Sequence, residues 1–133
     1  RMPKNPPKHS KSLIDSIKEP ILSRPIISEF HDYGAQTGMF MLRYKDWKLI
    51  VYPGFRSQLF NLREDPGEKH DYALGSVHSE TIESLTKILC SILDPKKVNL
   101  QAFQDQEERI AELGGRESIL STQNFDHTPV KLN

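Results

Sequence analysis

The feature that most constrains the fold is a series of short apolar segments in the first half of the chain, separated by only a few turn-forming residues. Four segments have the length and composition of β-strands, at residues 25–30, 38–43, 47–52 and 57–62. The links between the last three are too short for the crossover that parallel strands require, and Pro53-Gly54 is typical of a tight turn. The sequence therefore predicts an antiparallel meander.

After these segments the period of the apolar pattern becomes helical. Residues 79–93 carry apolar side chains at helical spacing, namely Ile82, Leu85, Ile88, Leu89 and Ile92. This stripe needs an apolar surface, and the sheet is the nearest one, because nine of the eleven aromatic residues lie between Phe30 and Tyr72. We expect an α+β fold: an antiparallel sheet of about four strands packed by an amphipathic helix, followed by a second helix and an extended tail.

The second helix is marked at both ends. Asp94 suits the N-cap, Pro95 the first helical position, and Gly114 the left-handed residue after the C-terminus. Its apolar residues are sparse, so the helix is expected at an edge or against a neighbouring chain; they are Val98, Ala102, Phe103, Ile110 and Leu113. Residues 115–133 show few apolar residues and no period, which predicts an extended tail.

We expect three parts: a basic, proline-rich linker arm with a short helical turn at 1–24, the α+β subdomain at 25–93, and the C-terminal helix and tail at 94–133. Lys plus Arg number 18 and Asp plus Glu number 18, and this balance disfavours binding to nucleic acid or a membrane surface. No apolar run is long enough to cross a membrane.

A self-contained active site is not evident. Cys90, the single cysteine, lies in the apolar helix and is interpreted as a buried or flanking structural residue. His70 and His78 lie on either side of a short loop and could hold a metal, although surface histidines are far commoner. The phosphate-binding glycine motifs and the G-x-S-x-G motif do not occur.

One polar segment between the first two predicted strands can make ligand contacts. It contains His31, Asp32, Tyr33 and Gln36. The same residues also fit a structural role, in which Asp32 shapes a turn and His31 caps the sheet edge. The residues alone leave both interpretations open.

Four segments occur in a specific order: Arg24-Pro25-Ile26-Ile27-Ser28-Glu29-Phe30-His31, Gly38-Met39-Phe40-Met41-Leu42-Arg43, Trp47-Lys48-Leu49-Ile50-Val51-Tyr52, and Gln58-Leu59-Phe60-Asn61-Leu62-Arg63-Glu64-Asp65-Pro66-Gly67-Glu68. Together they resemble the C-terminal subdomain of the type I sulfatases, within the alkaline-phosphatase-like superfamily. Residues near the end of the chain also look like arylsulfatase or choline-sulfatase-like members. The departures are small: Phe30 replaces a tyrosine, Asn61 an aspartate and Asp71 an asparagine.

The resemblance implies hydrolysis of sulfuric esters. Family members use a formylglycine made from the cysteine of a C-x-P/A-x-R motif and a divalent metal, usually calcium, both held in a larger N-terminal domain. Cys90 is followed by Ser91-Ile92-Leu93-Asp94, so it lacks this motif. We therefore expect neither the nucleophile nor the metal ligands, and hence no cofactor, in this chain.

The chain is thus expected to be a C-terminal fragment of a sulfatase-like hydrolase, inactive alone, whose partner is the missing N-terminal catalytic domain. The family architecture implies that His31, Asp32, Tyr33 and Gln36 lie on the rim of the substrate pocket. Two alternatives are a fragment of a phosphonate or phosphate monoester hydrolase from the same superfamily, and a non-catalytic assembly module that forms a homo-oligomer through the C-terminal helix and tail. The compartment, cytoplasmic or periplasmic/exported, is left open.

Overall fold

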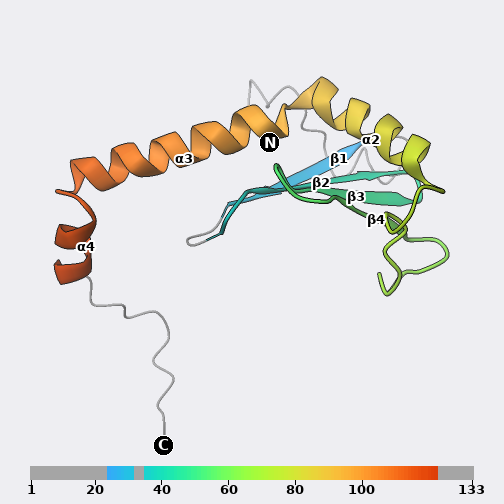
Figure 1. The fold of residues 1–133 in the computed structure, drawn as a ribbon. Coiled ribbons are helices and arrows are strands. Elements are labelled where there is room, and N and C mark those ends of the chain that lie inside the picture. Colours follow the sequence, from blue (N-terminus) through green and yellow to red (C-terminus); the bar gives the residue numbers. More distant parts are fainter. Residues whose placement is uncertain (1–23, 32–34, 123–133) are drawn as a thin grey trace, which may run out of the picture. The chain divides into compact units, whose positions relative to one another are not determined.

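A computed structural model describes residues 24–31 and 35–122 of the 133-residue chain (Figure 1). The expected linker arm and its helical turn lie outside these residues, apart from Arg24. The chain divides into two compact units, residues 1–96 and residues 97–133. Each unit is described by itself below.

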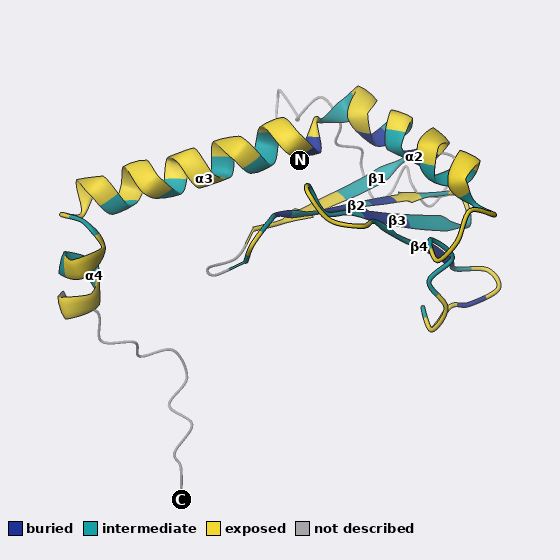
Figure 2. Cartoon of the chain, in the orientation of Figure 1, coloured by how far each residue is buried: buried dark blue, intermediate teal, exposed yellow. Residues whose placement is uncertain are grey.

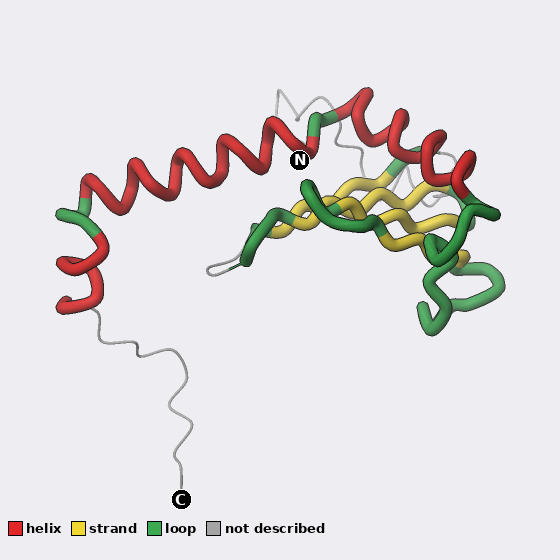
Figure 3. Tube along the Cα trace, in the orientation of Figure 1, coloured by secondary structure: helices red, strands yellow, loops and turns green. Residues whose placement is uncertain are grey.

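The first unit contains one antiparallel sheet with strands in the order β1-β2-β3-β4 (Figure 3). The strands are β1 (Ile26–Phe30), β2 (Met39–Tyr44), β3 (Trp47–Val51) and β4 (Gln58–Asn61). Each strand pairs with its neighbour in sequence, so the predicted meander is confirmed. The link between β2 and β3 is only two residues long, and its first residue, Lys45, adopts a positive φ of 54°.

The core lies between one face of the sheet and α2 (Ser79–Ile92), as predicted from the helical stripe (Figure 2). The register places Leu42 opposite Leu49, and Leu49 opposite Leu59, so all three side chains project from the same face. These residues and Leu89 of α2 are completely buried, and Leu85 is 4% exposed. Each large apolar side chain buried in this way contributes about 1.5–3 kcal/mol to folding.

Of the two alternatives for Cys90, buried or flanking, the structure excludes the buried one. Its residue is exposed, although its neighbour Leu89 is fully buried. Adjacent residues on a helix point about 100° apart, so Cys90 faces away from the sheet surface that Leu89 contacts. Cys90 is therefore not part of the core.

The outer edge of β4 is covered by the chain that follows it. The amide of Leu59 donates to Oδ1 of Asp71 at 3.0 Å, and the amide of Tyr72 donates to the carbonyl of Leu59 at 2.8 Å. Further along, the amide of Asp65 donates to the carbonyl of Asn61 at 2.8 Å. These bonds satisfy backbone groups that would otherwise be available for pairing with another strand.

The second predicted helix is α3 (Pro95–Glu112), and both predicted ends are confirmed. Oδ1 of Asp94 accepts a hydrogen bond from the amide of Lys96 at 2.9 Å. At the other end Gly114 has a φ of 85°. Its amide donates to Ala111 and the amide of Gly115 donates to Ile110, which is the Schellman pattern.

The predicted extended tail at 115–133 is wrong for its first part, because residues Arg116–Thr122 form α4. A helix of seven residues is too short to display a clear period of 3.6, so the pattern did not reveal it. Glu117 in the first turn and the bond from the amide of Ile119 to the carbonyl of Gly115 support it locally. Residues 123–133 lie outside the described part of the chain.

Candidate functional site

The site predicted from the sequence lies at one end of the sheet, where the β1–β2 and β3–β4 connections meet. The antiparallel register pairs Phe30 with Met39, Phe40 with Val51, and Ile50 with Gln58. The two connections therefore leave the sheet at the same end. The β2–β3 turn and the segment after β4 leave at the opposite end.

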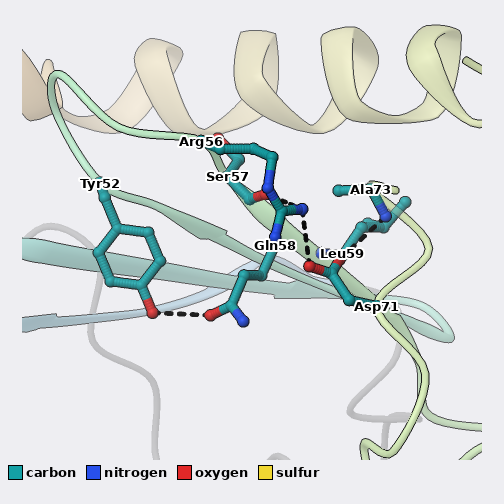
Figure 4. Close-up of polar contacts among 7 residues, drawn as sticks. All are labelled: Tyr52, Arg56, Ser57, Gln58, Leu59, Asp71 and Ala73. Carbon is teal, nitrogen blue, oxygen red and sulfur yellow. Dashed lines mark hydrogen bonds and ion pairs between the residues drawn. The ribbon is translucent and has the colours of Figure 1, made fainter. Parts of the chain in front are cut away.

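Two hydrogen bonds hold this end of the sheet together. Oγ1 of Thr37 donates to the carbonyl oxygen of Pro53 at 3.0 Å and so ties the β1–β2 connection to the β3–β4 connection. The hydroxyl of Tyr52 donates to Oε1 of Gln58 at 2.8 Å, across the mouth of the β3–β4 connection (Figure 4). These two bonds hold the β1–β2 and β3–β4 connections in place at this end of the sheet, and loops held on a rigid sheet commonly carry ligand contacts.

His31 is positioned by two neighbours immediately after β1. Its ring meets the ring of Phe40 edge-on, with centroids 5.4 Å apart and planes at 81°. Its Nε2 lies 3.9 Å from Oε2 of Glu29, and its side chain is 32% exposed. This geometry fixes the ring against β2 while leaving part of it open to solvent, where a histidine can donate or accept a hydrogen bond.

The structure describes two of the four predicted site residues. His31 and Gln36 both lie in the β1–β2 connection, and both are exposed. Asp32 and Tyr33 lie outside the described residues, so the choice between a ligand loop and a simple turn is not tested by their placement.

The carboxylate of Asp71 forms a network that sequence reasoning missed (Figure 4). Its Oδ1 accepts from the amides of Leu59 at 3.0 Å and Ala73 at 2.9 Å, and its Oδ2 accepts from Nη1 of Arg56 at 2.8 Å. Partial burial by itself would raise the pKa of Asp71. The two backbone hydrogen bonds and the Arg56 guanidinium outweigh that effect and hold the pKa below its ordinary value of 3.8. Through these bonds Asp71 ties the edge of β4 to the segment that follows the strand, which is a structural role.

Three aromatic rings form a cluster at the opposite end of the sheet. Trp47 lies 5.9 Å from Tyr72 and 5.4 Å from His78 between ring centroids, and Tyr72 lies 5.3 Å from His78. Desolvation and the nearby carboxylate of Glu64 raise the pKa of Tyr72. Because His78 is the residue just before α2, the cluster anchors the start of that helix on β3.

The histidines considered as metal ligands lie in different surroundings. The side chain of His70 is 78% exposed, and its Nδ1 lies 3.5 Å from Oδ2 of the buried Asp65. His78 belongs to the aromatic cluster instead. Within residues 24–31 and 35–122 the structure groups no three His, Cys, Asp or Glu side chains in a way that could hold a metal ion. In the same ranges no helix combines the length and apolar character needed to cross a membrane.

Comparison with known proteins gives the same sulfatase resemblance as the sequence motifs. The chain is 40% identical to arylsulfatase K of Gallus gallus over 77 residues, which are 56% of this chain and 14% of that protein. It is 36% identical to arylsulfatase K of Homo sapiens over 87 residues, covering 63% of this chain and 16% of that protein. It is 33% identical to arylsulfatase K of Danio rerio over 88 residues, covering 64% of this chain and 16% of that protein.

No family model matches the chain. The matched part spans only about one-seventh of the length of these curated relatives. The predicted resemblance to a sulfatase is confirmed, and it concerns a part of such an enzyme.

Proposed function

Because the chain is similar to part of a sulfatase, we propose that it is the C-terminal subdomain of a sulfatase-like hydrolase of sulfuric esters. In this role it supports a catalytic domain and contributes to the rim of the substrate pocket. The observation that carries the proposal is the arylsulfatase K similarity on a chain whose four-stranded antiparallel sheet is packed by a helix.

The absence of the family's nucleophile from the sequence supports an auxiliary role. Cys90 is the single cysteine of the 133 residues, and the residues after it do not form the C-x-P/A-x-R motif. It is exposed and lies in the last turn of α2. Formylglycine and calcium would therefore belong to the catalytic domain, and this chain by itself is expected to be inactive.

The face of the sheet opposite the α2 side offers a surface for that domain. Phe30 and Met39 are paired across β1 and β2 on this face, and Met41 lies two residues further along β2. Phe30 is 52% exposed, and both methionines are half-buried. Towards β4 the same face is occupied by Lys48, whose Nζ lies 6.0 Å from the Phe60 ring centroid. The apolar part near β1 and β2 suits docking against another protein surface.

The end of the sheet that carries the β1–β2 and β3–β4 connections suits the rim of the substrate pocket. His31 is fixed by Phe40 and Glu29 and is partly open to solvent, so it can contact the organic part of an ester without being a catalytic residue. Asp32, Tyr33 and Gln36 belong to the same connection and complete the proposed rim.

Replacing His31 with alanine, in a protein that joins this chain to its catalytic domain, tests the rim role. Loss of one hydrogen bond to the substrate costs about 1 kcal/mol, so we expect KM to rise about fivefold for esters that reach His31, with a changed ranking of substrates. Steady-state kinetics on several aryl and alkyl sulfates measure this. The matched control is His70→Ala, which removes an exposed histidine at the other end of the sheet. Unchanged KM values and an unchanged ranking in His31→Ala would contradict the rim role.

A further inference from the structure

The two edge strands of the sheet differ in how far the chain covers them. In β4 three of the four residues are buried, whereas β1 contains no buried residue and its second half is exposed (Figure 2). The edge of β4 is closed by the bonds of Leu59 with Asp71 and Tyr72. Among the described residues, β2 is the only strand that pairs with β1. The outer edge of β1 is therefore open in this part of the chain.

An open edge selects its partner by backbone chemistry. In an antiparallel pair, every second residue turns its N–H and C=O toward the paired strand, and the residues between turn theirs away. The outward groups of β1 form a row whose spacing an extended chain matches, so a strand satisfies them better than a helix does. β1 contains neither proline nor lysine, and Glu29 is its single charged residue, so little in its sequence opposes such pairing.

The same strand contributes to the apolar face opposite α2. Phe30 is 52% exposed and lies on this face beside the half-buried Met39. A strand added next to β1 would extend the face and place one of its own side chains beside Phe30. One partner element would therefore cover both the open edge and the exposed aromatic ring.

The sulfatase similarity supplies a partner for this edge. The matched part is 14–16% of the length of the arylsulfatase K relatives, so most of such an enzyme lies outside it. A second copy of this chain is a poorer partner. A two-fold antiparallel pair centred on the exposed half of β1 would place the two Glu29 carboxylates directly opposite each other, and like charges in that position are destabilising.

We propose that β1 pairs with an extended strand of the catalytic domain, so that the sheet continues from this subdomain into that domain. The inference rests on the proposed function, because it takes the sulfatase catalytic domain as the partner. It adds the element that joins the two, namely the outer edge of β1, with Phe30 packed beside the added strand.

Amide hydrogen exchange tests the pairing directly. In the purified 133-residue chain, about half of the β1 amides should exchange fast, because they point away from β2. In a protein that joins this chain to its catalytic domain, the same amides should exchange at least tenfold more slowly. The amide of Leu59 is the internal control, since Asp71 already binds it in both proteins. Outward amides that exchange equally fast in both proteins, or that are already slow in the isolated chain, would overturn the pairing.

Ser28→Pro and Glu29→Pro form a matched pair of variants. The amides of these adjacent residues point to opposite sides of β1, and their exchange rates identify the outward one. Proline at the inward position removes a bond to β2 and should destabilise the isolated chain. Proline at the outward position should leave its urea midpoint unchanged but weaken its association with the separately produced catalytic domain at least tenfold. Unchanged association of the outward variant would contradict the proposal.

The pairing and the proposed function fail separately. If the joined protein hydrolyses sulfate esters while the outward amides of β1 stay fast, the pairing is wrong and the function stands. If these amides become slow in a joined protein without sulfatase activity, the pairing holds and the function is wrong. A dimer of the isolated chain that protects the outward amides, measured by sedimentation and exchange, would assign the edge to a second copy and overturn the pairing.

Discussion

Replacing Leu89 with alanine is expected to lower the free energy of unfolding of the sheet-and-helix unit by about 3 kcal/mol. Leu89 is completely buried where α2 contacts β2 and β3, against side chains that are themselves fully buried. Truncation removes the free energy gained by burying the side chain. It also leaves a cavity between α2 and the sheet, because the surrounding residues relax only partially. Since small domains are stable by only about 5–15 kcal/mol, this is a large fraction of the total.

Urea unfolding followed by the fluorescence of Trp47 and by circular dichroism measures this change. Cys90→Ala is the matched control, because it truncates the next residue of the same helix at an exposed position, and its effect should be within about 0.5 kcal/mol. If Leu89→Ala unfolds at the same urea concentration as the control, then α2 does not stabilise the sheet in the way described.

The second large effect is expected at Asp71, where alanine should cost about 2–3 kcal/mol. This substitution removes the acceptor for the amides of Leu59 and Ala73, and it releases Arg56 as well. The amide of Leu59 lies at the edge of β4 and loses its partner. Asparagine keeps one side-chain oxygen for the two amides and loses the ion pair with the exposed Arg56, so Asp71→Asn should cost about 1 kcal/mol or less.

Acid titration gives a second measurement at Asp71. The folded state holds the pKa of this carboxyl below 3.8, so its charge-dependent contribution to stability is fully present above the unfolded pKa of about 3.9. That contribution is lost as the pH falls through the lower, folded pKa. The difference in stability between the unmodified chain and Asp71→Asn should therefore shrink in acid below about pH 4. Equal stability of all three proteins at pH 7 would contradict the role of the network.

Local patterns were sufficient for most of the fold. The four strands and α2 were predictable because their apolar residues repeat at the periods of a strand and a helix, and the links are too short for other topologies. The ends of α3 were predictable because Asp94, Pro95 and Gly114 each have a strong preference for one position. α4 was missed because seven residues cannot display a helical period.

Contacts between distant residues were beyond local patterns. Asp71 accepts from Leu59, which is 12 residues away, and Thr37 donates to Pro53, which is 16 residues away. Only the register of the meander brings these groups together. A short polar side chain such as Asp71 after a turn is a weak sign of backbone capping, and no sequence pattern identifies the amide it will bind. The proposed rim role of His31 involves a catalytic domain as well, which no pattern in this chain describes.

Hydrolysis of an aryl sulfate, measured with added calcium, tests the central proposal most directly. We expect turnover from a protein that joins this chain to its sulfatase catalytic domain, and no turnover above background from the purified 133 residues alone. Turnover by the isolated chain, in proportion to its concentration and retained through purification, would contradict the account.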